Sequence, residues 1–273
     1  MTTGQVRTPP GWLALREPAD AAARAPELVE EIRRYLPAAG GMTVHDLGSG
    51  TGSMARWLAP QLTGAQHWIL YDRDGELLTH AAADPPGAAA DGAPVTMQTR
   101  LRDVTRLHPD ELAGASLITA SALLDVMTSD ELERLISSCA GVRCPVLITL
   151  SVTGCVELAP ADPLDRCVAD AFNAHHRRSV GARRLLGPDA VSAAVEGFTR
   201  LGFDVLVRRS PWRLGPAQSA LAAAWFTGWL AAASEQRPEL AAATSYRRRR
   251  LAEADEGRLS VTVGHEDLLV LPG

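Results

Sequence analysis

A glycine-rich segment that begins with an acidic residue is the first part of the sequence that could do chemistry. It directly follows a short apolar run, Thr43 to Leu47, and reads Asp46-Leu47-Gly48-Ser49-Gly50-Thr51-Gly52. The residues after it, Met54 to Leu62, have the pattern of a helix. A strand, a glycine loop and a helix in this order let a ligand approach the backbone closely at the edge of a sheet. The spacing is not the G-x-G-x-x-G of dinucleotide-binding folds, because Ser53 stands where the last glycine would be.

Two further acidic residues follow the next two apolar runs. Asp72 lies twenty residues after Gly52, at the end of the run Trp68 to Tyr71. A carboxylate there can accept hydrogen bonds from both hydroxyls of a ribose. Asp103 follows Val95 to Thr99 at the same expected edge, where it could accept a hydrogen bond from an adenine amino group. Three acidic positions after three successive strands predict a site for a nucleoside.

With these motifs the chain resembles class I, Rossmann-like methyltransferases over about residues 40 to 150. The resemblance implies S-adenosyl-L-methionine as cofactor and S-adenosyl-L-homocysteine as product. It also implies that Asp46 orients the amino group of the cofactor, that Asp72 holds the ribose and that Asp103 with Val104 holds the adenine. The full set of expected cofactor-binding residues is Asp46, Gly48, Ser49, Gly50, Gly52, Asp72, Arg73, Asp103, Val104, Ser121, Arg16 and Arg24.

The two arginines in this set come from a segment that precedes the sheet. In many relatives an upstream helix covers the cofactor, so Arg16 or Arg24 is expected to pair with the methionine carboxylate. An exposed arginine is the alternative for each.

The elements that must position these residues alternate between short apolar runs and helix-compatible stretches. The expected strands are Thr43 to Leu47, Trp68 to Tyr71, Val95 to Thr99, Leu117 to Ala120, Val146 to Leu150, Phe203 to Arg208 and Leu259 to Val263. Such alternation predicts an α/β fold with a doubly wound, mostly parallel seven-stranded sheet. The resemblance implies that the last strand is antiparallel.

The flanks of this pattern define the expected domain organisation. Residues 1–40 are interpreted as an N-terminal helical cap and residues 41–273 as the methyltransferase domain. A helical insertion at about residues 216–256 separates the last two strands. Ser151 to Gly187 is expected to be a loop and a helix, and the Gly- and Ala-rich stretch Ala81 to Pro94 the end of a helix and a loose loop.

Composition excludes several kinds of chemistry. All 27 basic residues are arginine, so a Walker A lysine, a Schiff-base lysine and a lysine general base are impossible. The net charge of -5 argues weakly against broad nucleic-acid binding. The four cysteines lack the close pairing of a zinc site, so buried reduced thiols and no metal are expected. No export signal or membrane span is found, so a cytoplasmic protein is the default.

Candidates for the acceptor side follow the fourth and fifth strands. Asp125 is expected either to orient a substrate or to cap the helix region Thr128 to Ile136. His175 or His176 could act as a general base. The alternative is a solvated helix face with one histidine packed inward. The expected substrate contacts are Asn173, Arg177 and Trp212, with packing against the helical insertion as the alternative for Trp212.

A basic run, Arg247 to Arg250, is interpreted as a solvated helical face rather than a nucleic-acid site, because acidic residues follow it immediately. The sequence therefore favours methyl transfer to an O or N atom of a small molecule by a monomer or homodimer. The alternatives are an RNA or protein methyltransferase, a non-catalytic module that binds S-adenosylmethionine, and, least favoured, a nicotinamide oxidoreductase.

Overall fold

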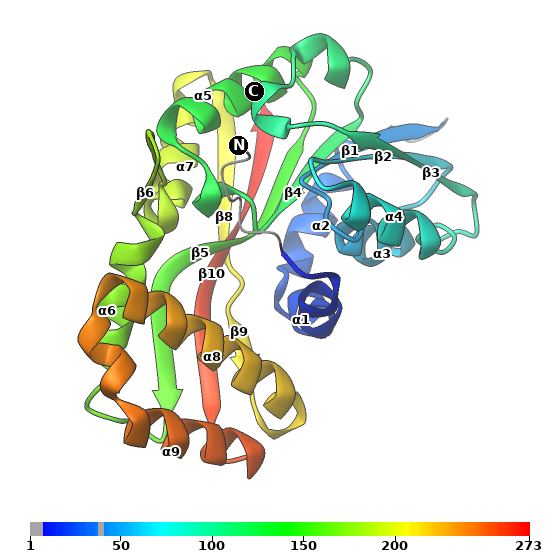
Figure 1. The fold of residues 1–273 in the computed structure, drawn as a ribbon. Helices are drawn as coiled ribbons and strands as arrows, with labels where there is room; N and C mark the ends of the chain where they lie inside the picture. The colour runs from blue at the N-terminus through cyan, green and yellow to red at the C-terminus, as the bar shows by residue number, and fades with distance from the viewer. Residues whose placement is uncertain (1–7, 38–40) are drawn as a thin grey trace.

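The computed structural model describes residues 8–37 and 41–273, and a mixed sheet runs through its centre (Figure 1). The strand order is β3-β2-β1-β4-β5-β10-β8, and a short strand, β9, pairs with β10 beside this path. The first five strands are parallel, whereas β10 is antiparallel to both of its neighbours β5 and β8. The expected α/β fold with a mostly parallel sheet and an antiparallel last strand is therefore confirmed, with β9 as an eighth strand.

The strands of this sheet are β1 (Met42–Leu47), β2 (Gln66–Asp72), β3 (Val95–Leu101), β4 (Leu117–Ser121), β5 (Val146–Ala159), β8 (Phe203–Arg209), β9 (Trp212–Leu214) and β10 (Ser260–Pro272). The α-helices are α1 (Pro10–Ala23), α2 (Pro26–Ile32), α3 (Ser53–Leu58), α4 (Gly75–Ala83), α5 (Ser129–Val142), α6 (Asp165–His176), α7 (Ala190–Arg200), α8 (Ser219–Gln236) and α9 (Thr244–Asp255). Within the described residues, no helix has both the length and the apolar character needed to cross a membrane. The expected cap, residues 1–40, includes positions 1–7 and 38–40, which lie outside the described residues.

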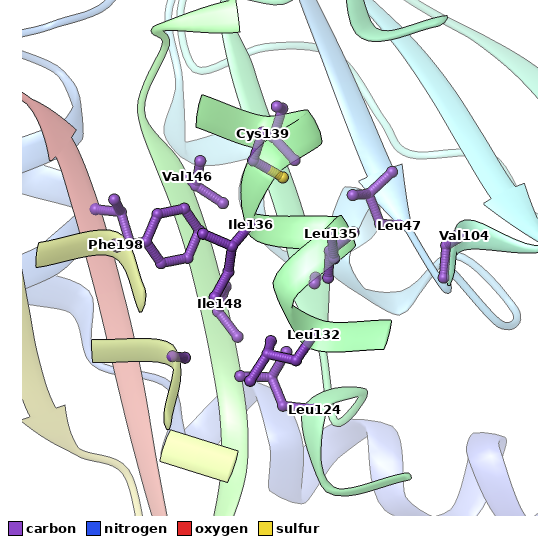
Figure 2. Packing of buried hydrophobic residues seen from close by; sticks show 14 of the residues in the cluster. Leu47, Val104, Leu124, Leu132, Leu135, Ile136, Cys139, Val146, Ile148 and Phe198 are labelled. Atoms are coloured by element: carbon purple, nitrogen blue, oxygen red, sulfur yellow. The ribbon is translucent and has the colours of Figure 1, made fainter. Parts of the chain in front are cut away.

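Two apolar clusters hold helices against the two faces of the sheet. One joins β1, β4 and β5 to α5 and α7, and Figure 2 shows Leu132, Leu135 and Ile136 of α5 turned towards the strands. The other joins the opposite face to α2, α3 and α4. Helix α5 begins with a capping box in which Thr128 and Glu131 each bond the backbone of the other. This packing on both faces fixes the positions of the carboxyl ends of β1 to β4 relative to one another.

The expectation that residues after Leu150 form a loop is wrong, because β5 continues to Ala159. The continuation pairs with the first part of β10, where Val261 faces Leu158 and Val263 faces Val156. Figure 1 shows the two strands side by side in this extension, with the short β9 next to β10. Val156 and Leu158, which stand two positions apart and so share one face of the strand, pack in a third cluster with α6, α8 and α9. A search for continuous apolar runs does not detect such a half-buried strand.

A buried carboxylate fixes the junction between the sheet and this extension. Asp267 of β10 accepts hydrogen bonds from the backbone N–H of Leu150 at 2.7 Å and of Ala25 at 2.9 Å. It also accepts a bond of 2.5 Å from the hydroxyl of Ser210. Leu150 has a positive φ of 57° at this bend. One side chain thus ties β5, β10, the end of β8 and the start of α2 together.

Three smaller expectations also need correction. Residues Ser179–Val180 and Arg183–Arg184 form a two-stranded hairpin, β6 and β7, inside the segment expected to be a loop and a helix. Arg250 is buried, not solvated, because it bonds Asp165 at 2.5 Å and Glu253 at 2.8 Å. All four cysteines are free, but Cys155 is exposed because it lies on the solvent face of the β5 extension.

Candidate functional site

A cavity of about 770 Å³ opens at the carboxyl ends of the parallel strands. This edge is where open α/β sheets bind their ligands. The cavity brings together many of the residues singled out in the sequence, namely Gly48, Asp72, Arg73, Asp103, Val104, Asp125, His175 and His176. They follow strands β1, β2, β3 and β4, and the last two come from α6. The arrangement expected from three successive strand ends is therefore present.

The glycine loop wraps over the end of β1 and is fastened by Asp72. Gly48, Gly50 and Gly52 all have positive φ, of 70°, 55° and 84°, which explains why glycine occupies each position. The N–H of Gly50 donates to Asp72 Oδ2 at 2.9 Å, and the N–H of Asp74 donates to Asp72 Oδ1 at 2.9 Å. Each carboxylate oxygen has a second lone pair. Asp72 can therefore hold the loop and still accept hydrogen bonds from a ligand in the cavity.

Asp103 lies on the cavity wall after β3. Its Oδ1 accepts hydrogen bonds from the N–H of Thr105 at 3.1 Å and from the Thr105 hydroxyl at 2.7 Å. These bonds cap the short helix Val104–Arg106 and orient the carboxylate. The neighbouring Val104 is buried in the apolar cluster beneath it. The carboxylate beside an apolar side chain can accept a bond from an amino group while the flat face of a ring packs on Val104.

A group of buried polar side chains lies around the glycine loop. Arg24 donates to Ser121 Oγ at 3.2 Å and to Thr149 Oγ1 at 3.4 Å. Asp46 Oδ1 accepts a bond of 2.7 Å from the hydroxyl of Thr119. Buried atoms of the group that lack a hydrogen-bond partner among the described residues are Arg24 Nη1, Asp46 Oδ2 and Ser49 Oγ. Unpaired buried polar groups are costly, so these three atoms are free to pair with polar groups of a ligand, although none of the three residues lines the cavity itself.

Burial shifts the pKa of several acids and bases at this edge. Burial raises the pKa of Asp46 to about 7, and the Thr119 hydrogen bond and the charge of Arg24 oppose the rise only in part. Burial also raises the pKa of Asp125 to about 6. It lowers the pKa of His176 to about 4, assisted by the nearby His175 and Arg178. Near neutral pH, Asp125 is therefore ionised and His176 is neutral.

Two of the catalytic candidates, Asp125 and His175, differ in whether other protein groups already bond their polar atoms. Thr128 caps α5, so Asp125 is not the cap of that helix and its side chain lines the cavity. His175 lies against the cavity, but its Nε2 is 2.8 Å from Glu235 Oε2 and its Nδ1 is 3.2 Å from Arg178 Nη1. Because both ring nitrogens have partners, His175 is poorly placed to take a proton from a ligand. Both histidines line the cavity, although they are adjacent on α6.

Several expected contacts lie away from the cavity wall. Arg16 bonds Asp20 at 2.9 Å and lies 4.9 Å above the Trp212 ring. Trp212 is buried and donates to Asp20 at 2.9 Å, so it holds β9 against α1. Asn173 donates to the carbonyl of Gly154 at 2.8 Å, and Arg177 bonds Asp189 at 2.6 Å on both arms of its guanidinium. These four side chains already have protein partners.

The structure adds lining residues that the sequence did not reveal. They come from α4, from the segments after β3 and β4, and from the hairpin and α8, and include Leu77, Arg102, Thr105, Met127, Arg178, Arg183, Leu185 and Ala232. Arg178 lies two residues after the His175–His176 pair and could have been found by that position alone. Arg183 and Ala232 reach the cavity only through tertiary packing, so no local signal marks them.

Comparison with known proteins gives matches among solved structures only. No protein-family model matches the sequence, and no curated protein matches it. The chain is similar to an S-adenosylmethionine-dependent methyltransferase from Thiobacillus denitrificans in complex with S-adenosyl-L-homocysteine, with 18% identity and a TM-score of 0.47 over 98% of this chain and 100% of that chain. A corresponding complex from Geobacter sulfurreducens has 18% identity and a TM-score of 0.45 over 98% and 100%. The cyclopropane synthase MmaA2 from Mycobacterium tuberculosis has 13% identity and a TM-score of 0.45 over 88% of this chain and 83% of that chain.

Proposed function

We propose that the protein is a methyltransferase that uses S-adenosyl-L-methionine and acts on an O or N atom of a small molecule. The observation that carries the proposal is that Gly48, Asp72 and Asp103, which follow three neighbouring strands, line one cavity. The order of the strands places the glycine loop, then Asp72, then Asp103 along one edge. That order suits an elongated ligand whose amino-acid end, ribose and adenine succeed one another.

The residues present fit this cofactor. Arg24 Nη1 and Asp46 Oδ2, which are buried and incomplete, would receive the carboxylate and the ammonium group. Asp72 would accept the ribose hydroxyls, and Asp103 with Val104 would hold the adenine. Arg24 serves this role better than Arg16, because Arg16 is already paired with Asp20. S-adenosylmethionine, when bound, would supply an electrophilic methyl group.

The protein's own contribution to the chemistry would be alignment and proton removal. The acceptor would occupy the part of the cavity beyond the fourth strand, lined by Leu123, Asp125 and Met127. With its pKa near 6, the Asp125 carboxylate can accept the proton that an O–H or N–H acceptor loses. His176 is the second candidate base, but a pKa near 4 makes it a weaker one.

The test is calorimetric titration of the whole protein with S-adenosylmethionine and with S-adenosylhomocysteine, using NAD as a competing ligand class. The isosteric change Asp72→Asn keeps an oxygen for the Gly50 N–H but removes the charge that two ribose hydroxyls would meet. We expect affinity for both ligands to fall about tenfold or more, because hydrogen bonds to charged groups contribute about 1.5–3 kcal/mol.

Asp91→Asn is the matched control. Asp91 also accepts a glycine N–H, that of Gly64 at 2.9 Å, and the N–H two residues further on, that of Ala93 at 3.2 Å, but it lies outside the cavity. Its substitution should leave both affinities unchanged. Failure of the folded wild type to bind either ligand, or tighter binding of NAD, would refute the proposal. Turnover with a cell extract separates a methyltransferase from a non-catalytic binding module, and transfer of a labelled methyl group to RNA or protein would overturn the small-molecule acceptor.

A further inference from the structure

Arg178 stands out among the cations of the cavity. Within the part of the chain that the structure describes, four arginines line it, namely Arg73, Arg102, Arg178 and Arg183. Arg183 bonds Glu131 at 2.9 and 2.7 Å, and Arg102 bonds Glu111 at 3.3 Å. Arg73 follows β2 directly, on the side expected to hold the nucleoside. Arg178 lies on the other side, with the histidines, and forms no ion pair with a carboxylate among the described residues.

Neighbouring side chains fix the position of this guanidinium. Its Nη1 donates to the carbonyl of His175 at 3.0 Å and lies 3.2 Å from His175 Nδ1. The other ring nitrogen of His175, Nε2, is 2.8 Å from Glu235 Oε2. Because a guanidinium can only donate, Nδ1 must be the acceptor, and the ring proton lies on Nε2 towards Glu235. Glu235 of α8 thus sets the histidine tautomer, and the histidine holds one arm of Arg178.

The remaining donors of Arg178 meet no carboxylate among residues 8–37 and 41–273. Its main-chain carbonyl accepts the N–H of Leu185, which fixes the hairpin beside it. Around it, the acceptor side of the cavity is lined by apolar Met127, Leu185 and Ala232. A fixed cation in partly apolar surroundings favours an anion that can bind it with two hydrogen bonds.

From this arrangement we propose that the acceptor molecule carries a carboxylate or phosphate group, which binds the Arg178 guanidinium. This inference deepens the proposed function and rests on it, since it names the substrate class of the same cavity. Arg178 is the binding residue, and His175 and Glu235 are positioning residues that act through it. An acid with an apolar body matches the lining better than a neutral or cationic acceptor does.

The experiment uses thermal unfolding of the whole protein, with S-adenosylhomocysteine present and absent, at constant ionic strength. The probes are benzoate, phenyl phosphate and the neutral amide benzamide, each as a concentration series that yields an apparent dissociation constant. We expect at least one anion to raise the unfolding temperature of the wild type more than benzamide does. A stronger effect of benzoate or of phenyl phosphate then identifies the anionic group.

Variants locate the effect. Arg178→Gln should weaken binding of the preferred anion about tenfold or more, and Arg178→Lys should restore part of it. Glu235→Gln should weaken anion binding by a smaller factor and leave the affinity for S-adenosylhomocysteine unchanged, which a merely structural role would not predict. Arg177→Gln is the matched control, because the adjacent Arg177 is paired with Asp189 away from the cavity.

The outcomes distinguish this inference from the proposed function. Equal responses of the wild type to the anions and to benzamide, or an anion response that survives Arg178→Gln, would overturn the inference. Loss of anion binding in Arg178→Gln but not in Arg177→Gln would support it. Because the probes are also titrated without S-adenosylhomocysteine, a protein that binds the anions but not this nucleoside would contradict the proposed cofactor and not the anion site.

Discussion

At the scale of single residues, the acids of the cavity differ in what burial does to them. Asp72 accepts two backbone N–H bonds, whereas Asp125 lines the acceptor side and has its pKa raised to about 6 by burial. An acid whose pKa lies slightly below the working pH is ionised and still basic enough to take a proton. This environment separates a binding carboxylate from a candidate base.

The role of Asp125 can be tested by its pH dependence. If Asp125 is the base, the rate of methyl transfer should rise as pH increases through about 6, because only the ionised carboxylate accepts a proton. Asp125→Asn should lower the rate by roughly 100-fold or more and abolish this rise. Release of S-adenosylhomocysteine with acceptors from a cell extract measures both. The exposed Asp130→Asn on α5 is the control, and an unchanged profile in Asp125→Asn would show that Asp125 is not the base.

The limits of sequence interpretation also appear at this scale. Asp72 and Asp103 could be placed because each directly follows a strand, and parallel strands end at one edge. Trp212 and Arg250 could not, because their environments depend on partners far along the chain, Asp20 for the first and Asp165 for the second. An exposed stacking ring and a buried one have the same local sequence.

At the scale of elements, the glycine loop shows why backbone conformation matters for the site. A side chain at Gly48 would combine two penalties, a positive φ of 70° and a Cβ only 2.9 Å from Leu123 Cδ1. Gly202 has a similar φ of 81°, with open space where its Cβ would stand. The two glycines therefore separate backbone strain from crowding.

We expect Gly202→Ala to lower the free energy of unfolding by about 1–2 kcal/mol, the cost of left-handed backbone for a residue with a Cβ. Gly48→Ala should lower it by at least as much, because the contact with Leu123 adds to the same backbone cost. Only Gly48→Ala should also weaken binding of S-adenosylhomocysteine, because the added methyl group displaces Leu123 on the cavity wall. Chemical denaturation and calorimetry measure the two effects. Equal affinities in the two variants would show that the loop does not contact the ligand.

Elements were predictable to different degrees. Strands β1, β2 and β4 were located within a few residues because they are largely buried and form continuous apolar runs. Strand β3 lies at the edge of the sheet and is partly exposed, and it was located from the short run that begins at Val95. The extension of β5 was not, because Thr153, Cys155 and Glu157 alternate with the apolar residues and interrupt the run. Strand β9 has three residues and depends on β10 for its hydrogen bonds, so no local pattern identifies it.

At the scale of the whole molecule, buried acids and buried histidines have opposite effects on stability as pH changes. Burial raises the pKa of Asp46 to about 7, so the folded state holds this proton more tightly, and stability falls as pH rises from about 4 to 7. Burial lowers the pKa of His45 and His176 to about 4 and of His265 to about 3. Unfolding exposes these histidines to protons, so their contribution to stability increases as pH rises towards 6.5.

Between pH 4.5 and 6.5 the three histidines outweigh the two acids Asp46 and Asp125, so the free energy of unfolding of the wild type should rise as pH increases. Asp46→Asn removes a group whose contribution falls as pH rises. The free energy of unfolding of this variant should therefore rise more steeply with pH, by about 1.4 kcal/mol per pH unit. His176→Gln should change the slope by a similar amount in the other direction. Urea unfolding of the ligand-free protein at three pH values in this window measures the slopes, and identical slopes in the wild type and Asp46→Asn would contradict the assigned pKa.

The position of β10 between β5 and β8 has a consequence for biosynthesis. Ribosomes make β5 and β8 long before Ser260–Pro272, so both strands have an unpaired edge until β10 inserts between them. Asp267, which joins Leu150 to Ala25, arrives in the same late segment. Nascent chains stalled before residue 260 should therefore expose sheet edges that recruit chaperones or neighbouring chains. Completion of the central sheet is thus a step that follows, and does not accompany, synthesis of the residues that line the cavity.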